Sequence, residues 1–107
     1  MDKAYTISDG QTTYAVDMPM VEQTGDATIQ PNVYNIWGAV TSLTITKGQD
    51  KVGIVNNYIA RFVAGADCSI QFVGFELQWI GGLAPIWEEG KIYEISIVEN
   101  FASFINS

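Results

Sequence analysis

Apolar and polar residues alternate in short runs along the chain from residue 29 onward. Within residues 40–46, Leu43 and Ile45 share one side of an extended chain while Thr44 and Thr46 occupy the other, and residues 91–98 alternate in the same way. A period of two residues predicts β-strands with one buried face. No run of about 11 residues combines a period of 3.6 with helix-capping residues, so the pattern predicts an all-β fold.

Turn-forming residues interrupt these runs at short intervals. The sequence Lys-Gly-Gln-Asp at residues 47–50 and the asparagine pair at residues 56–57 predict turns, with a short strand at residues 52–55 between them. The apolar residues change side between Phe72 and Val73, next to a glycine, which predicts a bulge or a change of sheet. Short strands joined in this way are typical of an antiparallel β-sandwich or a jelly-roll-like barrel, and we expect such a fold.

The N-terminal part of the chain is less regular. Two short runs, at residues 5–8 and 13–16, flank an Asp-Gly pair, which predicts a two-stranded hairpin. Pro19 has no amide hydrogen to give to a strand ladder, and the polar residues after it indicate a loop or an extended connector. We therefore expect a partly detached hairpin or arm at residues 1–28, followed by a β-sandwich domain at residues 29–107.

Composition and charge narrow the classes of partner. The chain has 107 residues, of which 48% are hydrophobic and 16% are charged, and this balance indicates one folded globular core. Its net charge is −7, and its 5 Lys and Arg residues are scattered, so we expect binding neither to nucleic acid nor to membranes. From the acidic start of the chain we expect no secretion signal, and no apolar run reaches the ~20 residues of a transmembrane helix.

Residues that could do chemistry are few. Cys68 is the only cysteine, and its apolar neighbours predict a small buried side chain without a disulfide. The chain has no histidine, which removes the commonest general base and the usual zinc ligand. Glu88 and Glu89 are adjacent in a predicted turn, whereas glycosidases need two facing carboxylates about 5 to 9 Å apart. The loop aspartates lack the spacing of a calcium loop. We expect no enzyme activity, no catalytic residue, no metal and no cofactor.

The three tryptophans differ in their expected environment. Trp79 is in phase with Phe75 and Leu77, which predicts a core position. Trp87 follows a proline at a turn, and the sequence leaves open whether its side chain is exposed or contacts another subunit. Trp37 precedes a glycine, and the sequence leaves its environment undecided as well. Exposed tryptophans stack on sugars, so a glycan-binding module is an alternative that their exposure would favour.

The C-terminal third carries a family resemblance. Residues 79–97 read Trp-Ile-Gly-Gly-Leu-Ala-Pro-Ile-Trp-Glu-Glu-Gly-Lys-Ile-Tyr-Glu-Ile-Ser-Ile. This run resembles a C-terminal signature of tailed-bacteriophage virion proteins, in which a strand ends in Trp, a Gly-x-x-Pro turn follows, and a Gly precedes Tyr-Glu-Ile-Ser-Ile. Residues 30–34 and 40–46 resemble the opening strands of that module and residues 58–62 resemble its middle, so the resemblance covers about residues 29–105.

The chain departs from the family pattern at two turns. Residues 72–74 stand where the family usually has a proline, and Glu-Asn-Phe at residues 99–101 replaces the usual Asn-Gly turn. Both departures change turn chemistry more than the core pattern. The resemblance implies that the following signature residues shape the core and its turns: Trp79, Pro85, Gly90, Tyr93, Ile95 and Ile97. Trp37 and Trp87 are its possible interface residues.

The resemblance also implies a function. Proteins of this type are non-catalytic structural subunits of the virion, made in the cytoplasm of the host bacterium: head fibres, capsid decoration subunits or pieces of tail fibres. Their partners would be other virion proteins of the capsid or tail, and fibre subunits are commonly homo-oligomers, with a trimer as the first expectation. The alternative is a receptor- or glycan-binding module of a tail fibre that contacts a glycan of the host surface.

Overall fold

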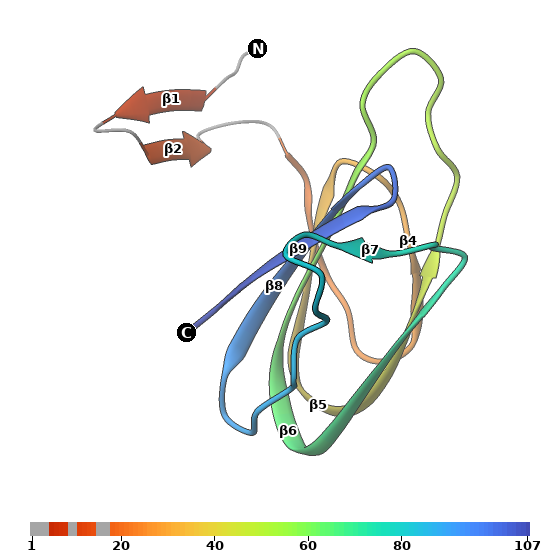
Figure 1. Ribbon diagram of the computed structural model, residues 1–107. Coiled ribbons are helices and arrows are strands. Elements are labelled where there is room, and N and C mark those ends of the chain that lie inside the picture. Colours follow the sequence, from red (N-terminus) through yellow and green to blue (C-terminus); the bar gives the residue numbers. More distant parts are fainter. Residues whose placement is uncertain (1–4, 9–10, 15–17) are drawn as a thin grey trace.

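The protein is built from strands alone. The computed structural model describes the backbone of residues 5–8, 11–14 and 18–107 and the side chains of residues 18–107. Every element in the described residues is a strand, so the all-β prediction is confirmed, and no helix that could cross a bilayer is found there. A hairpin and a larger sheet contain these strands: β1 (Tyr5–Ser8), β2 (Gln11–Tyr14), β3 (Met20–Glu22), β4 (Ala27–Ile29), β5 (Val33–Lys47), β6 (Asn57–Val73), β7 (Gln78–Trp79), β8 (Ile92–Val98) and β9 (Phe101–Asn106) (Figure 1).

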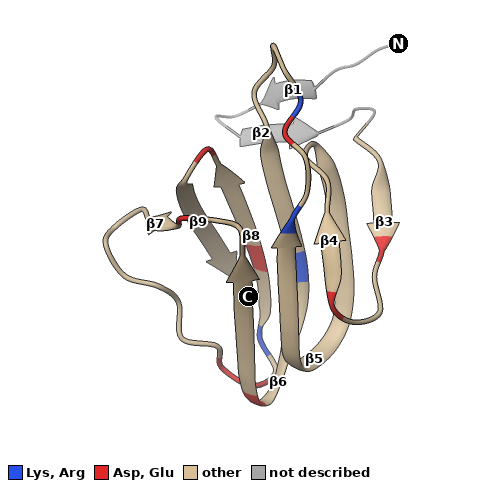
Figure 2. Ribbon diagram, turned by 90° about the vertical axis from the view of Figure 1, so that its right-hand side faces the viewer, with Lys and Arg blue, Asp and Glu red and all other residues tan. Residues whose placement is uncertain are grey.

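The two longest strands fold back on themselves. Val33, at the start of β5, is in register with Tyr58, and the Lys47 ammonium, at the end of β5, lies 5.8 Å from the centre of the same Tyr58 ring. A straight strand of 15 residues would span about 50 Å, so both ends reach Tyr58 only because β5 bends. Figure 2 shows β5 and β6 as neighbouring bends of the same shape. Each strand therefore has a first arm and a second arm: residues 33–40 and 42–47 of β5, and residues 57–64 and 69–73 of β6.

The bend has a local cause in both strands. The register between β5 and β6 shifts twice between residues 36 and 42, as β-bulges do where a strand turns. In β6, Gly65 lies so close to β5 that a Cβ atom there would be 2.9 Å from Thr41 Cγ2. Asp67 follows with a φ of 50°. These departures from regular pairing let the paired strands turn together.

The arms create two facing layers. The first layer has the order β3, first arm of β5, first arm of β6, β8, β9 and β7, and the second layer contains β4 and the second arms of β5 and β6. The pairs β3–β5, β4–β5, β5–β6 and β7–β9 are parallel, whereas β6–β8 and β8–β9 are antiparallel. The expected antiparallel arrangement is therefore wrong for the long strands. Alternating side chains identify the faces of a strand but not the direction of its partner.

The core lies between the layers. Tyr93, Ile95 and Ile97 point into it from β8 and are at most 2% exposed, which confirms their expected inward position. The other buried apolar residues of this cluster come from both layers: Ile29, Trp37, Leu43, Ile45, Tyr58, Ala60, Phe62, Ala64 and Ala102. Residues 74–91 pass along the open side of the two layers (Figure 1), and aromatic side chains from this segment pack against the core.

The boundaries of the elements differ from the expected ones at three places. The hairpin pairs β1 with β2, so its second strand begins two residues earlier than expected, and the predicted Asp-Gly turn lies outside the described residues. β3 and β4 pair with β5, so the sheet includes part of the expected arm at residues 1–28. Residues 52–55, expected as a strand, belong to a loop. The apparent separate strands at residues 33–37 and 40–46 are the two arms of β5.

Candidate functional site

Reactive side chains are dispersed in the described part of the chain. Among the described residues, no group of three His, Cys, Asp or Glu side chains could hold a metal ion. Glu88 and Glu89 are both exposed. Cys68 is half-buried rather than buried, and this partial burial raises the pKa of its thiol and so disfavours the nucleophilic thiolate. The structural feature that stands out is a loop.

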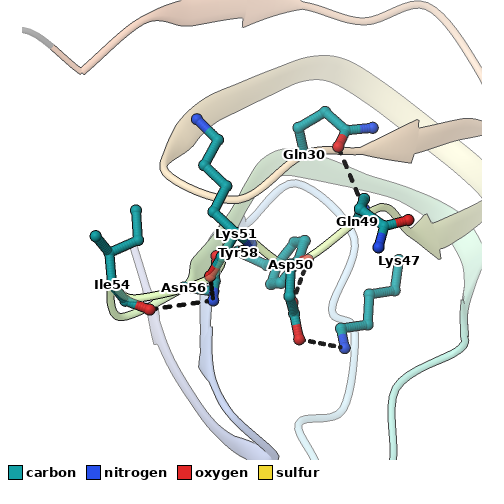
Figure 3. Close-up of polar contacts among 8 residues, drawn as sticks. All are labelled: Gln30, Lys47, Gln49, Asp50, Lys51, Ile54, Asn56 and Tyr58. Carbon is teal, nitrogen blue, oxygen red and sulfur yellow. Dashed lines mark hydrogen bonds and ion pairs between the residues drawn. The ribbon is translucent and has the colours of Figure 1, made fainter.

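The connecting loop, residues 48–56, returns the chain from the end of β5 to the start of β6. It begins at Gly48, whose amide donates to the Ile29 carbonyl oxygen over 2.8 Å. A Cβ atom at this position would lie 2.5 Å from that same oxygen, so only glycine fits. A further bond joins the loop to the segment after β4, because the Gln49 amide donates to Gln30 Oε1 over 3.3 Å (Figure 3). The loop therefore leaves β5 in a fixed direction.

Asp50 connects the loop to the core. The Tyr58 hydroxyl donates to Asp50 Oδ1 over 2.6 Å, and Lys47 Nζ donates to Asp50 Oδ2 over 3.1 Å (Figure 3). The bond from Tyr58, followed by the bond from Lys47, lowers the pKa of the Asp50 carboxyl below 3.8. Burial and the nearby carboxylate raise the pKa of Tyr58, so its hydroxyl stays a donor.

Asn56 closes the far end of the loop. Its Oδ1 accepts a bond from the Lys51 amide over 2.8 Å, and its Nδ2 donates to the carbonyl oxygens of Lys51 and Ile54 over 3.0 and 3.3 Å. Asn32, which has a φ of 62°, donates from Nδ2 to the Val55 carbonyl oxygen over 3.2 Å. Side-chain amides thus satisfy backbone groups that a loop without regular pairing leaves open.

The tip of this loop is apolar and exposed. Val52 is 100% exposed, Ile54 is 55% exposed and Val55 is 70% exposed. Single apolar side chains on a surface are common, but here three occur within four residues of a loop whose base is fixed by hydrogen bonds. We call residues 52–55 the loop tip. Its sequence and its position make it a candidate surface for binding another protein.

A second exposed apolar segment follows β7. Ile80 is 66% exposed, Leu83 is 79% exposed and Ile86 is 82% exposed, and with Pro85 and Phe104 they border a shallow hollow. The Tyr93 hydroxyl holds the end of this segment from the core side, as described below.

A polar pair lies on the outer face of the first layer. The Tyr34 hydroxyl donates to Glu94 Oε1, and Arg61 is in register with Glu94 on the neighbouring strand. Burial, followed by the bond to Glu94, raises the pKa of Tyr34 to about 12. The bond between Tyr34 and Glu94 joins β5 to β8 across β6 and so stabilises this face of the sheet.

The structure places the two open tryptophans differently. Trp37 is 3% exposed, and its Nε1 donates to the Gly25 carbonyl oxygen over 2.7 Å. Trp37 lies on the inward-facing side of β5, so its indole belongs to the core. The expectation that Trp37 is an interface residue is therefore wrong. Trp87 is half-buried and packs edge-on against Phe62 and Tyr93, at ring distances of 5.4 and 5.0 Å. Part of Trp87 is available to a partner.

The signature residues shape the segment between β6 and β8. Trp79 is half-buried and lies edge-on to Phe72 of one layer and Phe104 of the other, at 6.3 and 6.1 Å. Pro85 is half-buried and Gly90 has a φ of 88°, which suits the turn expected there.

Tyr93 holds the end of this segment. Its hydroxyl donates to the Ile86 carbonyl oxygen over 2.7 Å and accepts from the Glu88 amide over 2.8 Å. Because the Tyr93 ring is fully buried in the core, these two bonds fix the path of the chain at Trp87. The sequence placed Tyr93 in the core but gave no sign of this second role.

The connecting loop carries no sequence pattern that marks it as a site. Val52, Ile54 and Val55 favour strands, and their β-branched side chains gave the prediction of a short strand. The signals against a strand were Gly53, which has a φ of 86°, and the asparagines that follow. Comparison of the chain with models of protein families, with curated proteins and with solved structures found no match. Function is therefore inferred from contacts and exposure.

Proposed function

We propose that the protein is a non-catalytic structural subunit of a tailed-bacteriophage virion, a head-fibre or capsid-decoration protein, that attaches to another virion protein through the loop tip. One observation carries this proposal: apolar side chains at residues 52–55 are held in solvent by a loop with a hydrogen-bonded base. The resemblance of residues 79–97 to virion proteins gives the kind of particle.

A fixed apolar loop is well suited to docking. Burial of a Val or Ile side chain contributes about 1.5–3 kcal/mol, and the loop tip offers three such side chains. Because Asn56 and Asp50 already order the loop, binding loses little further conformational entropy. The partner is an apolar recess on a capsid or tail protein, and the protein resides in the virion.

A receptor- or glycan-binding role in a tail fibre has less support. Sugar stacking requires the face of an aromatic ring to be exposed, and the Trp37 indole is buried. Trp87 is half-buried with its ring against Tyr93. A glycan array with the purified protein tests this alternative directly, and specific binding that Trp87→Ala abolishes would favour it over docking.

The test uses particles of a phage that encodes this chain. Quantitative mass spectrometry of purified particles should find the wild-type protein at a constant copy number, and electron microscopy should locate it on the head. A Val52→Ser/Ile54→Ser/Val55→Ser variant should fold but be lost from the particles. The matched control replaces three other exposed apolar residues: Ile80→Ser/Leu83→Ser/Ile86→Ser. The control should remain attached.

The outcomes separate the two parts of the proposal. Absence of the wild-type protein from particles contradicts the structural role in the virion. Attachment of the loop-tip variant at the wild-type copy number contradicts the assignment of the loop alone.

A further inference from the structure

The outer edge of β9 is unpaired over its second half. The Ile92 amide donates to the Ser107 carbonyl oxygen over 2.9 Å, and the Ser107 amide donates back over 3.0 Å. Because hydrogen-bonded pairs alternate along an antiparallel ladder, the backbone groups of residues 101, 103 and 105 also face β8, whereas those of residues 102, 104 and 106 face away from it. On that outer side, β7 is in register with residues 101–102 alone.

The chain turns away from this edge directly after β7. The Ile80 amide donates to the Ala102 carbonyl oxygen over 2.8 Å, and two glycines at residues 81–82, with φ angles of 93° and 87°, then redirect the chain into a wide loop (Figure 2). Within the described part of the chain, no backbone group bonds the amide or the carbonyl oxygen of Phe104 or Asn106 on this side. Two donors and two acceptors therefore remain free at the edge.

A hollow of about 410 Å³ lies between this edge and the loop that follows β7. Phe104 and Asn106 line it from β9, and the other lining residues belong to residues 80–88, which we call the side segment. Ile80, Leu83 and Ile86 of the side segment are between 66% and 82% exposed. Free backbone groups and uncovered apolar side chains thus meet in one place.

The edge of β9 also lacks the features that usually prevent pairing with another chain. Natural edge strands carry charged residues, prolines or bulges. Residues 101–106 read Phe-Ala-Ser-Phe-Ile-Asn, without a charge or a proline, and their pairing with β8 has no register shift.

We propose that this hollow binds an extended segment of another protein, which adds a strand to the sheet beside β9. In strand addition, main-chain hydrogen bonds give affinity and alternate side chains give specificity. The free groups of Phe104 and Asn106 pair with the incoming backbone. These two residues share the inward phase of the buried Ala102, so the inward side chains of the added strand cover Phe104 and Leu83. Its outward side chains lie beside Ile105, which is 66% exposed.

Charge complementarity narrows the chemistry of the segment. Glu88 brings a carboxylate to the lining, which includes no Lys or Arg. Its Oε1 lies 3.6 Å from Lys91 Nζ, but the two side chains are 59% and 44% exposed, and an ion pair in solvent contributes little. The net charge of −7 also favours a cationic partner. The segment therefore has apolar residues at alternate positions and a Lys or Arg that reaches Glu88.

A second copy of the chain fits this edge less well. Its β9 would bring its own side segment to the same level, and two side segments would then compete for the space beside the two strands. A single extended chain is only one strand wide, about 5 Å. The site is separate from the loop tip, so the inference does not rest on the proposed docking to a virion.

A displayed library of random eight-residue peptides, selected on the purified full chain, tests the proposal. Selected peptides should alternate apolar residues and carry a Lys or Arg, and titration of one synthetic selected peptide gives a dissociation constant. Asn106→Pro removes a free amide that makes no bond to β8, and should weaken binding about tenfold. The matched control is Asn106→Ala, which keeps the amide and should bind as the wild type does.

A second pair of variants tests the apolar lining. Leu83→Ser should weaken binding about tenfold, whereas Val52→Ser, at the loop tip, should not change it. The Ile80→Ser/Leu83→Ser/Ile86→Ser variant, which should stay on the virion, should bind none of the selected peptides. Failure of this inference is thus distinguishable from failure of the loop-tip docking.

Hydrogen exchange distinguishes strand addition from contact with side chains alone. The amides of Phe104 and Asn106 should become protected when the peptide binds, whereas those of Ser103 and Ile105, which already face β8, should change little. A library without enriched peptides of this pattern, equal binding by Asn106→Pro and Asn106→Ala, or unchanged exchange at Phe104 and Asn106 would each overturn the proposal. Protection of these two amides by rising protein concentration without peptide would identify a second copy as the occupant and would also overturn it.

Discussion

Tyr58 and Asp50 connect the core to the exposed loop through one hydrogen bond. The Tyr58 ring is 2% exposed and lies edge-on to Phe75 at 5.3 Å, while its hydroxyl reaches Asp50 Oδ1 at 2.6 Å. Val33, at the start of β5, is in register with Tyr58, and the Lys47 ammonium, at the end of β5, lies 5.8 Å from the centre of its ring. Because core packing fixes the Tyr58 side chain, its hydrogen bond to Asp50 fixes the position of the loop base.

Tyr58→Phe should loosen the connecting loop without unfolding the core. The change keeps the buried ring and removes only the donor to Asp50, and a lost hydrogen bond of this kind costs about 1 kcal/mol. Urea unfolding should show a lower midpoint with an unchanged m-value. Amide exchange should accelerate at Lys51, whose bond to Asn56 depends on the loop base.

The control for this prediction is Tyr34→Phe. Tyr34 also donates to a carboxylate, that of Glu94, but it lies on the outer face of the first layer. Its substitution should leave exchange at Lys51 unchanged. Equal acceleration in both variants would show that the loop responds to general destabilisation, not to the loss of the bond to Asp50.

Asp50 should contribute to the pH dependence of stability. The bonds from Tyr58 and Lys47 lower its pKa in the folded state below the ordinary 3.8. The resulting stabilisation is present above 3.8 and is lost as the pH falls through the lower folded pKa. The free energy of unfolding of Asp50→Asn should therefore approach that of the wild type at low pH. A constant difference between the two proteins across the acid range would contradict the assignment.

The alternation of side chains predicted the faces of the strands well. Ile95 and Ile97 are buried as their phase requires, because one inward face of a strand is enough to fix the pattern. It did not predict that residues 33–47 form a single bent strand, because a bend leaves the period of two almost unchanged on either side. The relative direction of paired strands could not be predicted either, because parallel and antiparallel ladders bury the same alternate residues.

The candidate site could be predicted less well than the fold from the sequence. The loop tip has β-branched residues that favour strands in isolation, whereas bonds from residues outside it, among them Asn32 and Tyr58, help to hold it as a loop. Asn32 and Val55 are 23 residues apart in the sequence, and Asp50 and Tyr58 are 8 residues apart. Contacts of this kind depend on the fold of β5 and cannot be read from local pattern.

Ile95→Ala should destabilise the protein more than Trp79→Ala. Ile95 is fully buried, and its truncation leaves a cavity that typically costs about 3 kcal/mol. Trp79 is larger but half-buried at the open side of the layers, so its truncation should cost about 2 kcal/mol, below the usual range for a buried tryptophan. Chemical denaturation of both variants measures the order, and the reverse order would place Trp79 deeper in the core than the contacts indicate.

Asn35→Asp should destabilise the protein strongly at neutral pH and less in acid. Asn35 is 1% exposed, and its Nδ2 donates to the carbonyl oxygens of Val33 and Ile59 over 3.2 and 3.0 Å. A carboxylate cannot donate, so the variant would bury a charge against two acceptors at a cost of about 3 kcal/mol. Burial would raise the pKa of the new carboxyl, so stability should recover as the pH falls through that raised pKa.

Asn106→Asp is the matched control, because Asn106 is exposed and the change adds the same charge. Its free energy of unfolding should stay near that of the wild type at neutral pH. The free energies of unfolding of the two Asp variants should therefore differ most at neutral pH and converge in acid. Acid thus stabilises Asn35→Asp, whereas it removes the stabilisation that Asp50 gives to the wild type. A variant of Asn35 that is as stable as the control at neutral pH would mean that its side chain reaches water, and the assignment of Asn35 to the buried inner face of β5 would fail.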